Sequence, residues 1–426
     1  MEPSVAWTTG ANSGDHISRA PLRLHSGAPF FLVRDGLREG EGPFSPAPVP
    51  ASCDVAIIGA GITGALLADA LTGEGLHVVI LDRRAPACGS TAASTALLTY
   101  EIDVGLKELG EMIGVEAAVR AYQVSGGALN DLAKTAASLP DPCGFSRTSS
   151  VCLATHRRHT RALEEEVALR QRHGIEAQYW SPAQVEQTYG FPSHGALHTE
   201  TAGVLDPVRL TRALLDRAVG RGAVLLAHTA ARDVRTEGED AITVITDRGE
   251  MRARWVVYAI GYELPSQLRA GMVALHSTYA LVTEPLDDFG PWQGACIVWE
   301  TARPYHYMRA TEDRRVMIGG EDVPWKDAAT RDRLMPSRSH GLERQLEKWL
   351  PTLSTQTAFV WAGTFGETHD GLPYIGAMRG CPRAIFALGY GGNGITFGAV
   401  AARIVADICQ GRPNDDAVLF RLDRSH

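Results

Sequence analysis

The chain has few cysteines, no long apolar run and no excess of basic residues. Its seven cysteines are scattered, and none belongs to a CxxC pair. This usage favours the reduced thiols of the cytoplasm over a disulfide scaffold or a zinc site. No apolar stretch approaches the ~20 residues that span a bilayer, and the first residues lack the basic and apolar regions of a signal peptide. The formal charge of -8 argues against a nucleic-acid partner. We therefore expect a cytoplasmic protein without a transmembrane segment or bound metal.

A glycine-rich loop predicts a nucleotide site. An apolar strand at 55–58 runs into Gly59-x-Gly61-x-x-Gly64 and a helical pattern, and a second apolar strand ends at Asp82. In a Rossmann unit the first glycine makes the tight turn, the second lets the backbone approach a pyrophosphate, and the third allows close packing of helix and strand. The helix N-terminus attracts the phosphates. Asp82 is placed to accept hydrogen bonds from ribose hydroxyls, which disfavours an NADP 2′-phosphate.

The loop alone does not separate NAD from FAD, but three later segments bear on the choice. Small and hydroxyl residues follow Ser90 and Thr91; they either lie along a pyrophosphate and a flat ring or only begin a capped helix. A strand ending at the turn Ala259-x-Gly261 suggests that the chain re-enters the nucleotide sheet. A strand at 384–388 precedes a second glycine loop and a helix from about Ile395. The positive end of that helix would suit the N1–C2=O edge of a flavin; otherwise the loop is only flexible.

These segments together resemble the D-amino-acid oxidase (DAO) family of FAD-dependent oxidoreductases. The resemblance is carried by "DVAIIGAGITGA", "GSTAASTALL", "TAGVLDPVRLTRAL", "VVYAIGYE", "RPYHYMR", "MIGGED", "GETHDGLPYIG" and "GYGGNGIT", in the family's order from about residue 53 to 410. The motifs lean toward the γ-glutamylputrescine oxidase and glycine oxidase-like branch.

The resemblance implies FAD bound by particular residues of this chain. Non-covalent attachment is favoured, because "TAAST" has no histidine and "GETHDGLPYIG" has no cysteine where relatives attach their flavin. Arg83 and Arg84 either flank the adenosine or face solvent, and Ala231 would meet the adenine. The cofactor-binding residues expected are Gly59, Ala60, Gly61, Ile62, Thr63, Gly64, Asp82, Arg83, Arg84, Ser90, Thr91, Thr95, Ala96, Leu97, Ala231, Ala259, Gly261, Gly389, Gly391, Gly392, Asn393, Gly394, Ile395 and Thr396.

The substrate is expected under an antiparallel sheet. In "PYHYMR", strand alternation puts Tyr305, Tyr307 and Arg309 on one face. An arginine between two aromatic rings can hold a carboxylate in a fork; the alternative is an outer face with a solvated arginine. His369 and Asp370 could also border the site. Asp370 is expected to shape the turn before Gly371, with a catalytic role as the alternative. Asp206 before Pro207 is expected to be an N-cap, with a functional acid as the alternative.

The predicted fold class is α/β, with a Rossmann-like FAD-binding domain and a second, mainly antiparallel-sheet substrate domain. Residues 1–50 would be an irregular strap. Residues 51–139, 201–271 and 360–426 would form the FAD-binding domain, and residues 140–200 and 272–359 the substrate domain.

The predicted reaction is oxidation of a C–N bond in an amino acid or amine. The resemblance implies hydride transfer from the substrate carbon to flavin N5, hydrolysis of the imine, and oxygen as the acceptor. Such chemistry needs no dedicated protein base, so no catalytic residue is assigned. The alternatives are a dehydrogenase that reduces a quinone or carrier protein, and a non-catalytic FAD-binding subunit. The oligomeric state stays open.

Overall fold

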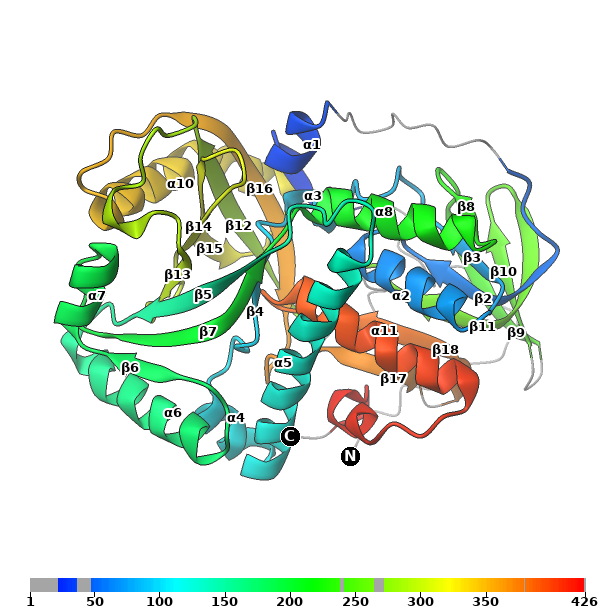
Figure 1. The fold of residues 1–426 in the computed structure, drawn as a ribbon. Helices are drawn as coiled ribbons and strands as arrows, with labels where there is room; N and C mark the ends of the chain where they lie inside the picture. The colour runs from blue at the N-terminus through cyan, green and yellow to red at the C-terminus, as the bar shows by residue number, and fades with distance from the viewer. Residues whose placement is uncertain (1–21, 37–46, 238–240, 264–271, 379, 425–426) are drawn as a thin grey trace.

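The computed structural model describes residues 22–36, 47–237, 241–263, 272–378 and 380–424. These residues form two halves that lie side by side, each built on its own sheet (Figure 1). No helix in the described ranges is both long and apolar enough to cross a membrane.

The first half contains a sheet whose central strands are parallel. Its order is β17-β18-β11-β2-β3-β8, and β9 and β10 continue from β11 as an antiparallel meander. The strands are β2 (Ser52–Ile58), β3 (Val78–Leu81), β8 (Val224–Leu226), β9 (Ala231–Glu237), β10 (Ala241–Thr246), β11 (Gly249–Tyr258), β17 (Tyr374–Met378) and β18 (Cys381–Leu388). The helices packed in this half are α2 (Ile62–Gly73), α5 (Val115–Ala137), α8 (Pro207–Gly220) and α11 (Gly394–Gln410).

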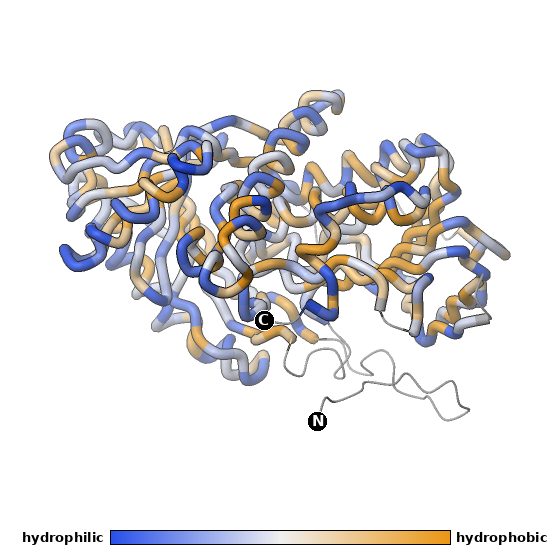
Figure 2. Tube along the Cα trace, turned by 90° about the horizontal axis from the view of Figure 1, so that it is seen from below, coloured by the Kyte–Doolittle hydropathy of each residue, from blue (hydrophilic) through white to orange (hydrophobic). Residues whose placement is uncertain are grey.

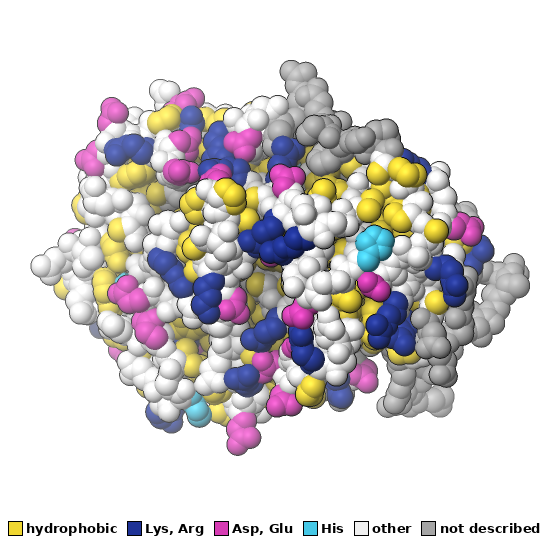
Figure 3. Space-filling view, turned by 45° about the vertical axis from the view of Figure 1, so that its right-hand side comes forward, with side chains coloured by type: hydrophobic (Ala, Val, Ile, Leu, Met, Phe, Trp, Pro, Cys, Tyr) yellow, Lys and Arg dark blue, Asp and Glu magenta, His cyan; other side chains and the backbone are white. Residues whose placement is uncertain are grey.

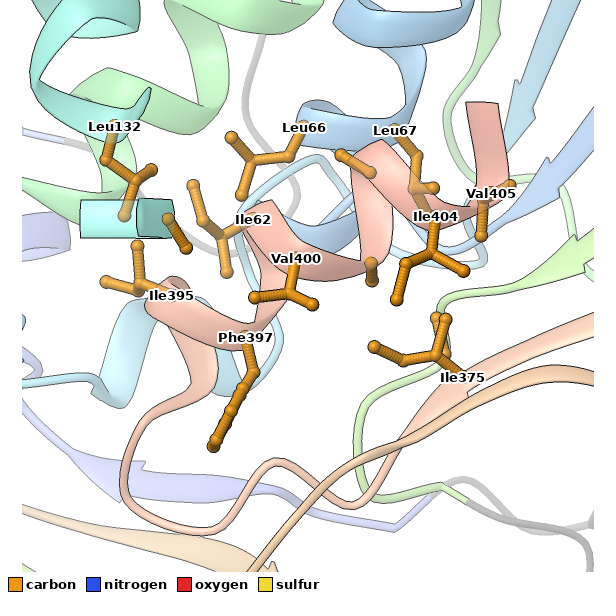
Figure 4. Close-up of a cluster of buried hydrophobic side chains, with 14 of the residues drawn as sticks. Ile62, Leu66, Leu67, Leu132, Ile375, Ile395, Phe397, Val400, Ile404 and Val405 are labelled. Carbon is orange, nitrogen blue, oxygen red and sulfur yellow. The ribbon is translucent and has the colours of Figure 1, made fainter. Parts of the chain in front are cut away.

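The parallel strands are apolar because both of their faces are covered. Along β2, Val55 and Ile57 pack toward the helices, while Ala56 and Ile58 pack toward the meander. On the helical side, α2 and α11 interlock through the side chains drawn in Figure 4. Hydrophobic stretches of the chain accordingly run through the centre and this half of the molecule (Figure 2). This layering holds the glycine loop after β2 in a fixed place.

The second half is built on a larger, mostly antiparallel sheet. Its order is β1-β16-β12-β15-β14-β13-β5-β7-β4, and β6 pairs with β7. The strands are β1 (His25–Gly27), β4 (Leu97–Thr99), β5 (Ser146–Leu153), β6 (Gln178–Trp180), β7 (Ala196–Val204), β12 (Ala274–Thr283), β13 (Cys296–Glu300), β14 (Tyr307–Ala310), β15 (Val316–Pro324) and β16 (Thr357–Glu367). The remaining α-helices are α1 (Phe30–Arg34), α3 (Ser90–Ala93), α4 (Leu106–Ile113), α6 (Thr160–Arg172), α7 (Pro182–Tyr189) and α10 (Ala328–Trp349).

Strand alternation gives this second sheet two different faces. Tyr279, Val298 and Met308 pack in a core with Leu342 and Leu346 of α10. The neighbouring residues Thr278, Trp299 and Tyr307 face the other way and line a cavity. One side of the sheet is therefore buried against α10, and the other side, the functional side, faces the glycine loop.

Sheet membership differs from the expected ranges in three places. Strands β4 and β16 and the last residues of β7 belong to the second sheet, although the expected ranges assign 97–99, 360–367 and 201–204 to the FAD-binding domain. Each of these segments lies where the chain passes between the two sheets, and β4 and β16 also line the cavity. The division into two domains stays a proposal.

The expected strap is only partly irregular. Residues 1–21 and 37–46 lie outside the described residues, but 22–36 contain β1 at the edge of the second sheet and the short helix α1. Phe30, Phe31 and Leu32 are buried against both halves. The expectation that residues 22–36 are irregular is therefore corrected.

Candidate active site

The glycine loop is held by very close backbone contacts. Gly59 has φ +115°, and a Cβ there would lie 2.3 Å from the Ala259 carbonyl oxygen. A Cβ on Gly64 would lie 1.8 Å from the Gly59 oxygen. These close approaches exclude any side chain at either position. They correspond to the tight turn at Gly59 and the close helix–strand packing at Gly64 that the spacing predicts.

A cavity of about 760 Å³ begins at this loop and ends at the functional side of the second sheet. Its volume falls within the range of small-molecule and cofactor sites. Most of the predicted cofactor residues line it: Gly59, Gly61, Ile62, Thr63, Asp82, Arg83, Arg84, Ser90, Thr91, Thr95, Ala96, Leu97, Ala231, Ala259, Gly261, Gly391, Gly392, Asn393, Gly394 and Ile395. The sequence motifs are thus brought together in one space.

Four predicted cofactor residues are not among the lining residues. Ala60 donates its N–H to Asp82 Oδ2 at 2.8 Å, and Gly64 lies behind the turn. Gly389 packs near Thr368, and the Thr396 hydroxyl donates to the Thr99 carbonyl oxygen. These residues shape the wall instead of facing the cavity.

Unsatisfied polar groups at the loop fit a phosphate-bearing cofactor. The Ser90 hydroxyl is buried and has no hydrogen-bond partner among the described residues, although Ser90 lines the cavity. Such a group costs about 1–3 kcal/mol unless a ligand satisfies it. Gly61, the N-cap of α2, has no side chain that could cap the helix. The N–H of the next residue, Ile62, donates to the Thr91 hydroxyl. Both features suit an anionic ligand at this helix end.

Asp82 is fixed in place by two backbone donors. Besides the Ala60 N–H, the Arg84 N–H donates to Asp82 Oδ1 at 2.8 Å. Burial raises the pKa of Asp82, and the two donors oppose that effect. Each carboxylate oxygen can accept more than one hydrogen bond, so both retain capacity for ribose hydroxyls.

The two arginines after Asp82 pair with an acid that the sequence analysis did not single out. Arg83 and Arg84 both bind Glu263, with Arg84 Nη1 2.8 Å from Glu263 Oε2. All three residues line the cavity. This end therefore combines positive and negative groups.

The opposite end of the cavity is aromatic and acidic. The ring centroids of Tyr305 and Tyr307 are 5.8 Å apart, and those of Trp299 and Tyr305 are 6.1 Å apart. The Tyr305 hydroxyl donates to Asp103 Oδ1 at 3.3 Å, and Asp103 Oδ2 accepts the Gly392 N–H at 2.8 Å. Asp103 thereby ties the tyrosine to the second glycine loop.

Asp322 lies at the same end. Its pKa is raised to about 6, because the carboxyl group is buried and stands near Asp103. Neither Asp103 nor Asp322 was predicted from the sequence as a site residue. The only available signal was the motif "GGED", because Asp103 follows β4 without any recognisable pattern.

The expectation that Arg309 holds a substrate carboxylate is wrong. The residue is 4% exposed, and its guanidinium donates to the carbonyl oxygens of Ala96 and Leu205, both at 3.1 Å. It also lies over the Phe31 ring, 5.4 Å from the centroid. Alternation gave the correct face for Tyr305 and Tyr307, but Arg309 lies deeper, behind the chain at Ala96, and is absent from the cavity lining.

His369 is also absent from the lining and is exposed. The neighbouring Asp370 is fully buried and pairs with Arg424, Nε to Oδ2 at 2.8 Å, while its Oδ1 accepts the Leu372 N–H. Asp370 therefore shapes the turn, as predicted. Asp206 caps α8 through the N–H groups of Val208 and Arg209, which confirms the N-cap.

Comparison with known proteins identifies the class of this site. The family of DAO-type FAD-dependent oxidoreductases matches residues 54–408, and the chain belongs to that family. It is an FAD-dependent oxidoreductase, and its cofactor is FAD.

Individual relatives have low sequence identity to this chain, but each match covers most of both chains. The chain is 22% identical to a probable oxidoreductase OrdL of Haemophilus influenzae, over 84% of this chain and 83% of the relative. It is also 22% identical to the gamma-glutamylputrescine oxidoreductase of Escherichia coli, over 87% and 86%. The crystal structure of a glycine oxidase from Geobacillus kaustophilus matches with a TM-score of 0.74 at 20% identity, covering 88% of this chain and 100% of that one.

Proposed function

We propose that this enzyme oxidises a C–N bond of an amine or amino acid and passes the electrons to oxygen. The observation that carries the proposal is the single cavity, which joins the glycine loop of β2 to a pocket of three aromatic rings on the second sheet. A gamma-glutamylputrescine oxidoreductase among the relatives and a glycine oxidase among the similar structures support nitrogen compounds as substrates.

The residues that would hold FAD follow from the lining. Asp82 would accept hydrogen bonds from the ribose, and Ser90 together with the N-terminus of α2 would receive the pyrophosphate. Bound FAD supplies a hydride acceptor for the substrate carbon. None of the described lining residues is a histidine or a cysteine, which supports non-covalent attachment.

The chain's own contribution would be positioning and exclusion of water. Trp299, Tyr305 and Tyr307 would cover the substrate with apolar surface. Asp103 would fix the position of Gly392 at the flavin side through the hydrogen bond to its N–H. The N-terminus of α11 would place partial positive charge at the same side.

Anaerobic mixing of the purified holoenzyme with D-amino acids, N-methyl amino acids and diamines tests this proposal. Bleaching of the visible flavin absorbance by at least one compound is expected, followed by rapid recovery when air is admitted. Slow recovery in air but fast recovery with a quinone would replace the oxidase by a dehydrogenase. A bound flavin that none of these nitrogen compounds reduces would overturn the proposal.

A further inference from the structure

Charged residues are segregated along the cavity. Among the described residues that line the cavity, the basic side chains are those of Arg83, Arg84 and Arg232, and there is no lysine or histidine. These stand at the nucleotide end, where Arg83 and Arg84 pair with Glu263 and Arg232 lies 3.4 Å from Asp247. A bound dinucleotide places its phosphates at this end, so the arginines suit the cofactor.

The end beneath the aromatic rings has the opposite charge. Asp103, Asp322 and Glu101 line it, and no lysine, arginine or histidine does so among the residues that the structure describes. Two of these acids have a buried side-chain oxygen without a hydrogen-bond partner in the described ranges, namely Asp322 Oδ1 and Glu101 Oε2. Glu101 is only 3% exposed, so water cannot freely satisfy its oxygen.

Cations outside the lining offset only part of this charge. Arg170 is buried beside Glu101, with Nη1 3.6 Å from Oε1. Arg303 is exposed; it stacks on the Tyr305 ring and donates to the backbone oxygen of Asp103, not to its carboxylate. His276 lies 3.4 Å from Glu367, and burial lowers the pKa of His276, which favours its neutral form. His306 also acts on Asp322, but its ring nitrogens pair with Glu300 and Glu321 at 2.6 and 3.4 Å. Among the described residues, no cation forms an ion pair with either Asp103 or Asp322.

We propose that the substrate is an amine with a second positive charge, of the alkyl diamine or polyamine class, and that Asp103 and Asp322 bind the second cation. This inference rests on the proposed function and specifies its substrate. A second ammonium group at this end would pair with two carboxylates and lie against aromatic faces, which attract cations through the ring quadrupole.

The same charges discriminate against α-amino acids. A substrate carboxylate at this end would meet two carboxylates at short range, and like charges in a site of low dielectric repel strongly. Arg309 cannot compensate, because its guanidinium is committed to Ala96 and Leu205 behind the wall.

Three probes of equal chain length measure the effect of charge. Binding to the oxidised holoenzyme is followed anaerobically by the change in the flavin spectrum and by flavin reduction, using 1,4-diaminobutane, butylamine and 4-aminobutanoate. These carry a cationic, an apolar and an anionic group at the far end. The diamine is expected to bind at least about 10-fold more tightly than butylamine, the gain of a charge-assisted hydrogen bond, and 4-aminobutanoate the most weakly.

Variants attribute the preference to the two acids. In Asp322→Asn the ratio of the dissociation constants of butylamine and 1,4-diaminobutane is expected to fall several-fold toward one, and Asp103→Asn should lower it in the same direction. Butylamine binding should change much less. The control Glu347→Gln, on an exposed position of α10, should keep the wild-type ratio, and the FAD content of each variant verifies that the cavity is intact.

The outcomes separate this inference from the proposed function. If amino acids reduce the flavin and the diamine neither binds nor reduces it, the inference is overturned and the proposed function stands. If none of the nitrogen compounds binds or reduces a correctly bound flavin, both fail. A diamine preference that survives in both asparagine variants would also refute the assignment to Asp103 and Asp322.

Discussion

Replacing Asp322 by asparagine should stabilise the protein in a pH-dependent way. Burial, reinforced by the nearby charge of Asp103, raises the pKa of this carboxyl from 3.8 to about 6. A carboxyl whose pKa is higher in the folded state resists ionisation there. Its contribution to stability is therefore fully present below pH 3.8 and is lost as the pH rises to about 6.

The size of the effect follows from the shift. Each pKa unit corresponds to about 1.4 kcal/mol, so the change from 3.8 to about 6 costs the folded state about 3 kcal/mol at neutral pH. Asparagine does not ionise and escapes this cost. The stability advantage of Asp322→Asn over the wild type should grow by about 2.5 kcal/mol between pH 4 and pH 8.

Urea unfolding at both pH values, with the same excess of FAD, measures this advantage. The FAD dissociation constant of each protein is determined separately, so that its contribution to stability can be subtracted. The exposed control Glu347→Gln should stay within about 0.5 kcal/mol of wild type at both pH values. An advantage of Asp322→Asn that is equal at pH 4 and pH 8 would refute the reasoning.

Three further predictions concern the frame of the cavity. Gly64→Ala forces a Cβ to 1.8 Å from a backbone oxygen and should cost about 3 kcal/mol or more with loss of bound flavin. Gly127→Ala, which meets nothing within 4 Å inside α5, should stabilise by about 0.5–1 kcal/mol; thermal unfolding and flavin content compare the two, and equal effects would contradict the packing argument. Arg424→Met leaves the fully buried Asp370 without its cation and should cost about 3–5 kcal/mol in urea unfolding; a cost below about 1 kcal/mol would contradict the buried pair. Arg309→Lys should weaken FAD binding about tenfold, because one ammonium cannot replace the guanidinium fork between two backbone oxygens. The ratio of diamine to butylamine affinity should not change, and a changed ratio would return Arg309 to the substrate site.

Features encoded by neighbouring residues could be predicted from the sequence. The turn at Gly59, the helix after it and the strand ending at Asp82 follow each other along the chain, so their spacing is sufficient. The same holds for the caps at Asp206 and Asp370, whose side chains bond to backbone only a few residues away.

Features that depend on how deeply a side chain is buried, or on contacts between residues far apart in the sequence, could not be predicted. Alternation assigns Arg309 to a face, but whether the chain at Ala96 covers it is decided by tertiary packing. Asp103 follows the edge strand β4, whereas Asp322 lies within β15, far along the chain, and the two acids meet at the cavity. Their shared environment, which carries the substrate inference, has no counterpart in any local motif.

The surface gives little further guidance to partners. On the face drawn in Figure 3, basic and acidic side chains are interspersed without a continuous patch of either sign. The segregation of charge described for the cavity has no counterpart on this face.

The strand order of the first half has a consequence for synthesis on the ribosome. Strand β2 lies next to β11, and β11 lies next to β18, so neighbours in the sheet are separated by long stretches of chain. Such pairings close slowly, because the entropy of long loops must be overcome first. A nascent chain that has released only its N-terminal glycine loop lacks both β18 and the N-terminus of α11, and so has no complete wall around the flavin. FAD capture should therefore be one of the last events of folding, after translation has ended, and a shortage of FAD should leave an apoprotein that already has its sheets but remains vulnerable to proteases at the open cavity.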